Sequence, residues 1–341
     1  MNRVSQICAS LLVMVSASTG FAGNGPNDLL FLAQSELSYQ IYRAGTDGKS
    51  PVRLTSDKKD NLQASWSPDG TKVAYTSMRN GNAEIYVMDA DGNHQRALAP
   101  HPGDDMYPVW SPDSRQIAFI SNREKVNAIY LVNTDGSNLH KLTPNAEEQQ
   151  DHAWSPNGRE IAFSVPTGRK LAVIKVASID NGGVKTLSDS SEQIADGSPS
   201  WSPDGSLIAY ISIEKNGINL KTMRPDGSNK VSLTTGNFRH SAPRWSSDSK
   251  QILFLGVRDT ARQDVYVINR DGSGERKLTH SGAEHVWASW SNDDKRIYFV
   301  ALDGPQSDIF VQETAGGLPT RITSGSGFKM DPLQVRVAKA N

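Results

Sequence analysis

Apolar positions in this chain fall in short runs of three to six residues, rich in β-branched and aromatic side chains and separated by polar segments. Residues 73–75 and 117–119 are such runs, and each is followed by a second run, at 85–87 and 129–131. No stretch spaces its apolar residues with the 3.6-residue period of an amphipathic helix. The pattern predicts an all-β protein built from many short strands.

These runs belong to a repeat that is marked by tryptophan. Six of the seven tryptophans begin a segment that reads Trp-Ser-Pro-Asp-Gly or a variant of it, and these six are 44, 44, 47, 44 and 45 residues apart: Trp66, Trp110, Trp154, Trp201, Trp245 and Trp290. After each segment come two apolar runs, an Asp-Gly or similar turn that is typical of a hairpin, and a short stretch ending in Leu-Thr or close to it. Four short antiparallel strands in a unit of this length are typical of a β-propeller blade.

The number of blades follows from the two ends of the chain. The six tryptophan strands suggest six blades, but the set of strands that follows each of them occurs a seventh time at residues 29–55, without a tryptophan strand before it. Residues 331–335 are similar to residues 60–64. We therefore predict one domain over residues 28–337 with seven four-stranded blades, in which the C-terminal strand, 332–337, completes the first blade and closes the ring. Six blades with an N-terminal extension are the alternative.

The first 22 residues differ from the rest. Arg3 is their only charge, an apolar run spans residues 7–15, and small residues lead to Ala22, so residues 1–22 are expected to be a cleaved signal peptide. The only cysteine, Cys8, lies within it, which excludes disulfides and thiol catalysis in the mature chain. With 36 Lys and Arg against 37 Asp and Glu there is no basic excess for nucleic acid. We expect a periplasmic or secreted monomer that does not span the membrane.

The repeat resembles that of the TolB-like β-propeller family in the order Trp-Ser-Pro-Asp-Gly, Ile-Ala-Phe, Ile-Tyr-Val-Met, Asp-Gly and Leu-Thr, over roughly residues 29–337. The same repeat occurs in propeller domains of prolyl oligopeptidase relatives and of oligogalacturonate lyases. TolB itself carries an α/β domain before a six-bladed propeller, so this chain is expected to be a stand-alone propeller. The resemblance implies a non-enzymatic scaffold in the cell envelope that binds a protein or peptide across the mouth of the ring.

Catalytic motifs give no support to an enzyme: the sequence has neither a Gly-x-Ser-x-Gly elbow nor a His-Glu-x-x-His zinc motif. We therefore expect no cofactor. The alternative is a metal-dependent polysaccharide lyase of the oligogalacturonate type, in which Asp196, His240 and His285 are the candidate ligands of a divalent cation.

Candidate binding residues emerge when the blades are aligned on their tryptophans. The positions five and six residues upstream fall where a loop enters the innermost strand, so they converge on one mouth of the channel, and many of them are acidic. Two interpretations stay open: acidic residues suit turns that precede strands, or the ring binds a basic or amino-terminal peptide segment. Tyr107 and Trp287, three residues before their tryptophans, would add apolar contact. The candidates are Asp60, Asp104, Asp105, Tyr107, Glu148, Asp196, His240, Glu284, His285, Trp287 and, by the C-terminal alignment, Asp331.

Overall fold

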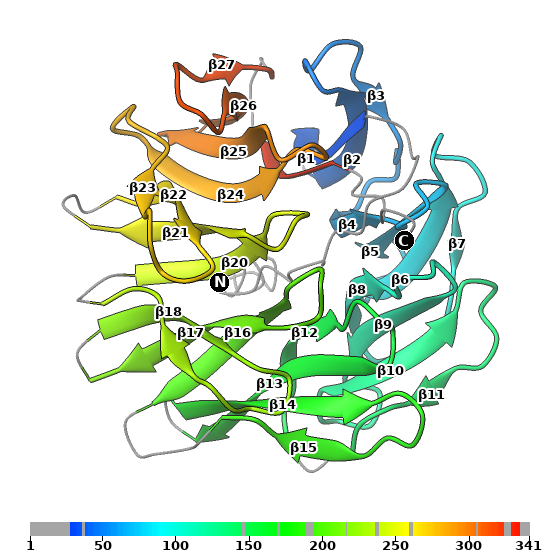
Figure 1. The fold of residues 1–341 in the computed structure, drawn as a ribbon. Coiled ribbons are helices and arrows are strands. Elements are labelled where there is room, and N and C mark those ends of the chain that lie inside the picture. The colour runs from blue at the N-terminus through cyan, green and yellow to red at the C-terminus, as the bar shows by residue number, and fades with distance from the viewer. Residues whose placement is uncertain are drawn as a thin grey trace.

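The chain folds into a ring of β-sheets around a central axis in a computed structural model (Figure 1). The structure describes residues 28–35, 38–144, 147–168, 171–188, 194–215, 217–235, 239–258, 262–304, 306–323 and 329–334. The predicted signal peptide, 1–22, and the last residues of the predicted domain, 335–337, lie outside this part. Nothing within the described ranges forms an apolar helix of membrane-spanning length.

The described residues form seven blades of four antiparallel strands, named here I to VII, in which the strand given first lies nearest the axis (Figure 1). One parallel pairing, of Ala172 with Ala195, joins blades IV and V into an eight-stranded sheet. Blade I consists of β28 (Lys329–Gln334), β1 (Asp28–Ser35), β2 (Ser38–Gly45) and β3 (Val52–Arg53). Blade II consists of β4 (Asn61–Trp66), β5 (Lys72–Ser77), β6 (Glu84–Asp89) and β7 (Arg96–Ala97), and blade III of β8 (Asp105–Trp110), β9 (Gln116–Ser121), β10 (Ala128–Asn133) and β11 (His140–Lys141). Blade IV consists of β12 (Gln150–Trp154), β13 (Glu160–Gly168), β14 (Leu171–Ser178) and β15 (Val184–Thr186), and blade V of β16 (Ala195–Trp201), β17 (Ile208–Glu214), β18 (Gly217–Met223) and β19 (Val231–Ser232). Blade VI consists of β20 (Arg239–Trp245), β21 (Gln251–Val257), β22 (Asp264–Asn269) and β23 (Arg276–Lys277), and blade VII of β24 (Glu284–Trp290), β25 (Arg296–Asp303), β26 (Gln306–Glu313) and β27 (Thr320–Arg321).

The repeated residues hold neighbouring blades together. The Trp110 indole Nε1 donates to the Ser65 carbonyl of the preceding blade at 3.1 Å, and Trp154 makes the same bond to Val109 at 3.1 Å. Side chains of two successive blades share each apolar cluster, so the core lies between blades rather than at the axis. The Asp-Gly turns need their glycine, since a Cβ at Gly227, where φ is +85°, would lie 2.8 Å from the Leu187 carbonyl oxygen.

Closure of the ring by the C-terminal strand is confirmed, since β28 pairs antiparallel with β1. The register, however, differs from the sequence alignment by three residues. Gln334 pairs with Leu29 as Trp66 pairs with Val73 in blade II, which aligns Asp331 with Gln63 rather than with Asp60. Met330, buried in the core between blades I and II, thereby takes the position that Leu62 has in blade II.

A buried ion pair fastens this closing strand to blade VII. Lys329 is 5% exposed, and its Nζ lies 3.4 Å from the Asp308 carboxylate on β26. The Ser307 hydroxyl donates to the Lys329 carbonyl at 2.7 Å and accepts its backbone N–H at 2.7 Å. Blade VII therefore contacts the strand that completes blade I through hydrogen bonds and an ion pair as well as through apolar packing.

Candidate functional site

The mouth that carries the sequence-predicted site is the end of the ring where the innermost strands begin. Asn61, the first residue of β4, pairs with Ser77 at the end of β5, so the hairpin between β5 and β6 opens at the same mouth. At the opposite end lie the Trp-Ser-Pro-Asp-Gly turns and the Asp-Gly turns, which follow the third strand of a blade. The two mouths therefore differ in the residues they expose.

Four of the predicted acidic residues, which we call the rim acids, are at least partly exposed at this mouth: Asp60, Asp104, Glu148 and Glu284. Three of them also cap a strand of the preceding blade. The carboxylate of Asp60 accepts the Tyr39 N–H at 2.8 Å, that of Asp104 the Ala83 N–H at 3.1 Å, and that of Glu148 the Asn127 N–H at 3.3 Å. The two interpretations of these residues are thus compatible, because a carboxylate that accepts one N–H keeps its charge and further acceptor sites.

The residues one position further along the strand are buried instead. Asp105 is 1% exposed and its carboxylate is 2.8 Å from the Arg123 guanidinium, while Asp196 is 5% exposed within blade V. Burial raises the pKa of Asp105, an effect that the charge of Arg123 opposes, and burial also raises the pKa of Asp196. Neither residue belongs to the exposed rim of the mouth, contrary to the role predicted for them.

His285 is likewise buried in blade VII. Its Nδ1 lies 3.1 Å from Asp264 Oδ1, its Nε2 lies 2.9 Å from the Ser281 hydroxyl, and burial lowers its pKa. Asp196 and His285 stand two blades apart, and across the described ranges no three His, Cys, Asp or Glu side chains gather as a metal site. The side chains of His240 and Asp331 lie outside the described part of the structure.

A second repeated feature, not identified in the sequence, is described three residues before five of the six repeat tryptophans. There the innermost strand has a β-bulge, and the residue adopts the left-handed backbone region, with φ between +46° and +58° in the described cases. We call this set the bulge ring; its members are Gln63, Tyr107, Asp151, Ser198 and Trp287. None is glycine, and for bulky Tyr and Trp this conformation is strained.

Most of the bulge ring is partly exposed on the strands nearest the axis. Gln63 and Trp287 are partly exposed although the strand residues on either side of them are buried, and Asp151 and Ser198 are partly exposed too, whereas Tyr107 is buried. Neighbouring members also reach one another around the axis: the Gln63 side-chain carbonyl accepts the Tyr107 N–H at 2.9 Å, and Asp151 Oδ2 accepts the Ser198 hydroxyl at 3.3 Å. Tyr107 and Trp287, selected from the sequence for apolar contact, both belong to this ring.

Two members of the ring are titratable and close together. Burial and, to a smaller extent, the charge of Asp151 raise the pKa of Tyr107 to about 12. Burial also raises the pKa of Asp151 to about 6. Its Oδ2 has the Ser198 partner, but its Oδ1 is buried without a hydrogen-bond partner in the part of the chain that is described. Asp151 was missed because its sequence neighbourhood carries no motif; its distance of three residues from Trp154 is the one signal.

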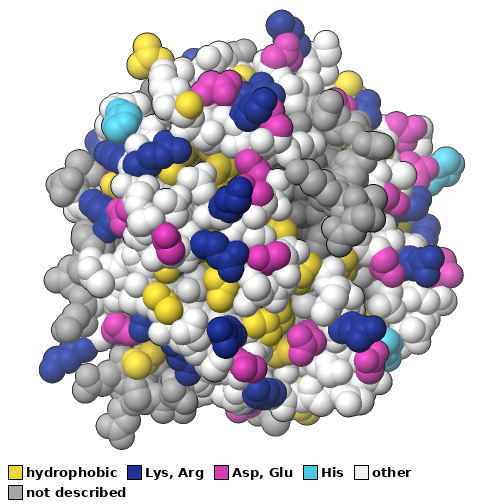
Figure 2. All heavy atoms as spheres, viewed as in Figure 1, with side chains coloured by type: hydrophobic (Ala, Val, Ile, Leu, Met, Phe, Trp, Pro, Cys, Tyr) yellow, Lys and Arg dark blue, Asp and Glu magenta, His cyan; other side chains and the backbone are white. Residues whose placement is uncertain are grey.

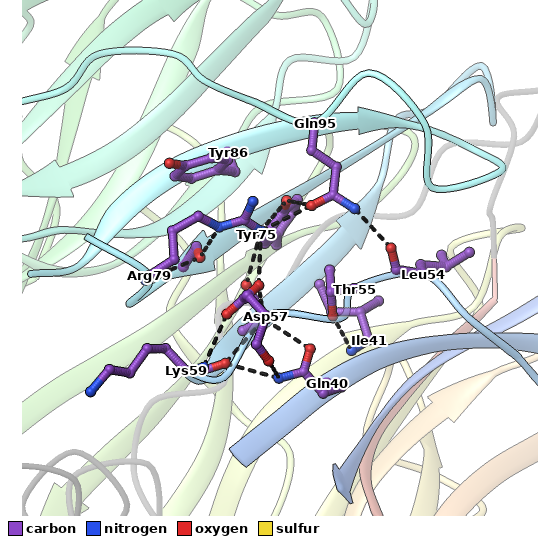
Figure 3. A network of polar contacts seen from close by, with 12 residues as sticks. Gln40, Ile41, Leu54, Thr55, Asp57, Lys59, Tyr75, Arg79, Tyr86 and Gln95 are labelled. Carbon is purple, nitrogen blue, oxygen red and sulfur yellow. Dashed lines mark hydrogen bonds and ion pairs between the residues drawn. The ribbon is translucent and has the colours of Figure 1, made fainter. Parts of the chain in front are cut away.

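Arginines that follow the second strand also reach this mouth. Arg79 and Arg123 stack over Tyr86 and Tyr130, with 4.3 and 4.7 Å from the guanidinium carbon to the ring centre. In Figure 3, Arg79 joins Asp57 at 3.1 Å and lies within a polar network between blades I and II. The mouth is therefore less uniformly acidic than the sequence suggested. On the face seen in Figure 2, acidic and basic side chains are likewise interspersed.

Comparison with known proteins identifies the repeat. Residues 61–247 match the family described as TolB beta propeller domain. Two curated relatives named Tol-Pal system protein TolB match 25% of this chain: that of Desulfosudis oleivorans is 31% identical over 84 residues, and that of Alcanivorax borkumensis is 36% identical over 89 residues. The matches cover 18% and 20% of these relatives, so the similarity spans about a fifth of their length.

Solved structures of similar fold have diverse titles. TolB from Acinetobacter baumannii is 15% identical, with a TM-score of 0.59 over 90% of this chain and 82% of that one. An oligogalacturonate lyase in complex with manganese is 14% identical, with a TM-score of 0.73 over 88% of this chain and 89% of that one. A puromycin hydrolase is 14% identical, with a TM-score of 0.72 over 95% of this chain and 56% of that one. At such identities these similarities show the propeller fold alone.

Proposed function

Because this chain belongs to the TolB beta propeller domain family, whose model matches residues 61–247 of its 341, we propose that it is a non-enzymatic propeller that binds a protein or peptide segment at its channel mouth. Its place is the periplasm or the exterior of the cell, and it acts as a monomer. The bound segment is basic, or enters with its amino terminus. The relatives named TolB support the location, and the site supports the ligand.

The observation that carries this proposal is the bulge ring beneath the rim acids. Tyr107 and Trp287 occupy a strained backbone region at equivalent places, and such strain is concentrated at binding and catalytic sites. Together the two sets place carboxylates at the mouth and two aromatic residues on the innermost strands, of which Trp287 is partly exposed and Tyr107 is buried. Carboxylates around a concavity attract a cationic segment, and the attraction weakens as salt is added.

The test is binding of a fluorescein-labelled hexalysine peptide, followed by fluorescence anisotropy. The rim variant carries Asp60→Asn, Asp104→Asn, Glu148→Gln and Glu284→Gln, whose amide oxygens can still accept the capping N–H groups. A unit charge about 8 Å away in water contributes about 0.5 kcal/mol. Loss of four such charges should therefore weaken binding about 30-fold at low salt, and much less at about 0.5 M salt.

A matched control changes the same charge at the other mouth. The exposed Asp-Gly turns supply it through Asp91→Asn, Asp135→Asn, Asp226→Asn and Asp271→Asn. We expect this control to bind hexalysine nearly as tightly as the parent protein. Equal weakening by the two variants would show that only net charge matters and would contradict a site at the predicted mouth.

A metal-dependent lyase remains the alternative function, with Asp196, His240 and His285 as its metal ligands. Asp196 and His285 are buried in blades V and VII, and His285 is bonded to Asp264 and Ser281 of its own surroundings. No described contact brings the two candidates to a common point. Nothing in the site therefore favours the lyase over peptide binding.

A further inference from the structure

Asp151 differs from the other members of the bulge ring in carrying a charge that its position does not require. Gln63, at the same place in blade II, satisfies its side-chain carbonyl with the Tyr107 N–H at 2.9 Å and the Thr76 hydroxyl at 2.7 Å. Ser198, at the same place in blade V, is a small neutral residue with the same left-handed backbone. The bulge therefore forms with neutral side chains, and an ionised carboxylate is not needed to build it.

The surroundings of Asp151 do not compensate this charge. Ser198 on β16 donates to its Oδ2, Ser164 on β13 is a second neutral neighbour, and Tyr107 on β8 is the ionisable group that faces it. Its Oδ1 is buried without a partner among the described residues, and no ion pair of Asp151 with a basic side chain is found in that part of the structure. A buried carboxylate without a cation or a full set of donors is costly. Asp151 nevertheless keeps part of its surface exposed on the innermost strand, where the channel lies.

We propose that Asp151 is the anchor for a single cationic group, a primary ammonium or a guanidinium, of the segment that enters the channel. The Tyr107 ring and the Ser198 hydroxyl flank this group, the first as an aromatic surface and the second as an additional polar contact. The inference rests on the proposed function and deepens it. The rim acids attract the basic segment from outside, whereas Asp151 selects one cation inside the channel.

Binding at this anchor is linked to protonation. A cation favours the ionised carboxylate, so it binds best above the pKa of Asp151 and less well where the carboxyl is neutral. Affinity should therefore fall between pH 7.5 and pH 5. A pH dependence that disappears with Asp151 alone is a sign that a purely structural residue would not give.

The experiment measures hexalysine binding to the parent, Asp151→Asn and Asp180→Asn proteins at pH 7.5 and pH 5.0. Asp180 is exposed in the hairpin turn between β14 and β15, at the opposite mouth, so its replacement makes the same charge change away from the site. At pH 7.5 Asp151→Asn should weaken binding about tenfold, as expected for loss of a charge-assisted contact, and Asp180→Asn less than twofold. The parent should lose most of this tenfold advantage at pH 5.0, and Asp151→Asn should show little change with pH.

The outcomes separate the anchor from the function on which it rests. If the rim variant binds weakly while Asp151→Asn binds as tightly as the parent at pH 7.5, the anchor is wrong and the binding mouth stands. If the parent protein fails to bind hexalysine at low salt, the cationic ligand is wrong and the anchor falls with it. If Asp151→Asn weakens binding equally at both pH values, its effect is structural and the anchor is again overturned.

Discussion

Replacing Asp151 with asparagine should stabilise the free protein at neutral pH. The substitution keeps the shape of the side chain and an oxygen that can accept the Ser198 hydroxyl, but it removes the charge. In the parent, burial raises the pKa of this carboxyl to about 6, from an ordinary value of 3.8. The folded state is therefore penalised whenever Asp151 is ionised, and asparagine removes the penalty.

The size and the sign follow from the two pKa values. A displacement from 3.8 to about 6 corresponds to about 3 kcal/mol, at about 1.4 kcal/mol for each pKa unit. Because the folded state binds this proton more tightly than the unfolded state, the parent regains the lost free energy as the pH falls from about 7 to about 4. The asparagine variant should thus be more stable than the parent by up to about 3 kcal/mol at pH 7.5, and by almost nothing at pH 4.

Urea unfolding of both proteins at pH 7.5, 6, 5 and 4 measures this difference. Contributions of all other titrating groups are common to the two proteins and cancel in the comparison. The Asp180→Asn protein, altered at an exposed turn, should differ from the parent by less than about 0.5 kcal/mol at every pH. A stability difference for Asp151→Asn that does not change with pH, or a variant less stable than the parent at pH 7.5, would refute the reasoning.

Three further predictions concern the fold. Trp110→Phe should lower the free energy of unfolding in urea by about 1 kcal/mol or more, because it removes the indole hydrogen bond to the Ser65 carbonyl. Trp201→Phe should lower it less, because the Trp201 Nε1 is buried without a partner in the described structure. Equal losses would mean that the hydrogen bond contributes nothing. Burial lowers the pKa of His152 to about 4, so the parent should lose up to about 3 kcal/mol of its free energy of unfolding as the pH falls from about 6.5 to 4. His152→Gln should remove this loss from the urea-derived stability profile. An unchanged profile would argue against burial of a neutral imidazole. Deleting residues 328–341 removes β28 with Lys329 and Met330 and should abolish cooperative thermal unfolding. A truncated protein that melts like the full chain would contradict closure of the ring by this strand.

The blade pattern could be predicted from the sequence because its signals are local. The tryptophan, the turn after it and the final threonine each act on neighbouring backbone: the Thr143 hydroxyl, for example, accepts the Ile129 N–H across one hairpin. The register of the closing strand could not be predicted in this way. Local similarity aligned Leu333 with Leu62, but burial of Met330 in the core decided the pairing.

The candidate site was predicted less well because side chains alternate along a strand. Adjacent positions such as Asp104 and Asp105 share a charge, yet one is on the rim and the other is buried beside Arg123. The bulge adds one residue to the strand, so side-chain directions cannot be counted back from the tryptophan through it. With glutamine, tyrosine, aspartate, serine and tryptophan at the bulge, its residue types carry no common signal.

Photo-crosslinking tests the central claim, a peptide site inside one mouth of the ring, most directly. The crosslinking residue p-benzoylphenylalanine would be placed in the bulge ring, as Trp287→p-benzoylphenylalanine, and at the opposite mouth, as Asp180→p-benzoylphenylalanine. Each protein would then be irradiated with labelled hexalysine at low salt. We predict a crosslinked product from position 287 that is lost at high salt, and little product from position 180. Equal labelling at the two positions, or labelling at position 180 alone, would contradict a binding site at this mouth.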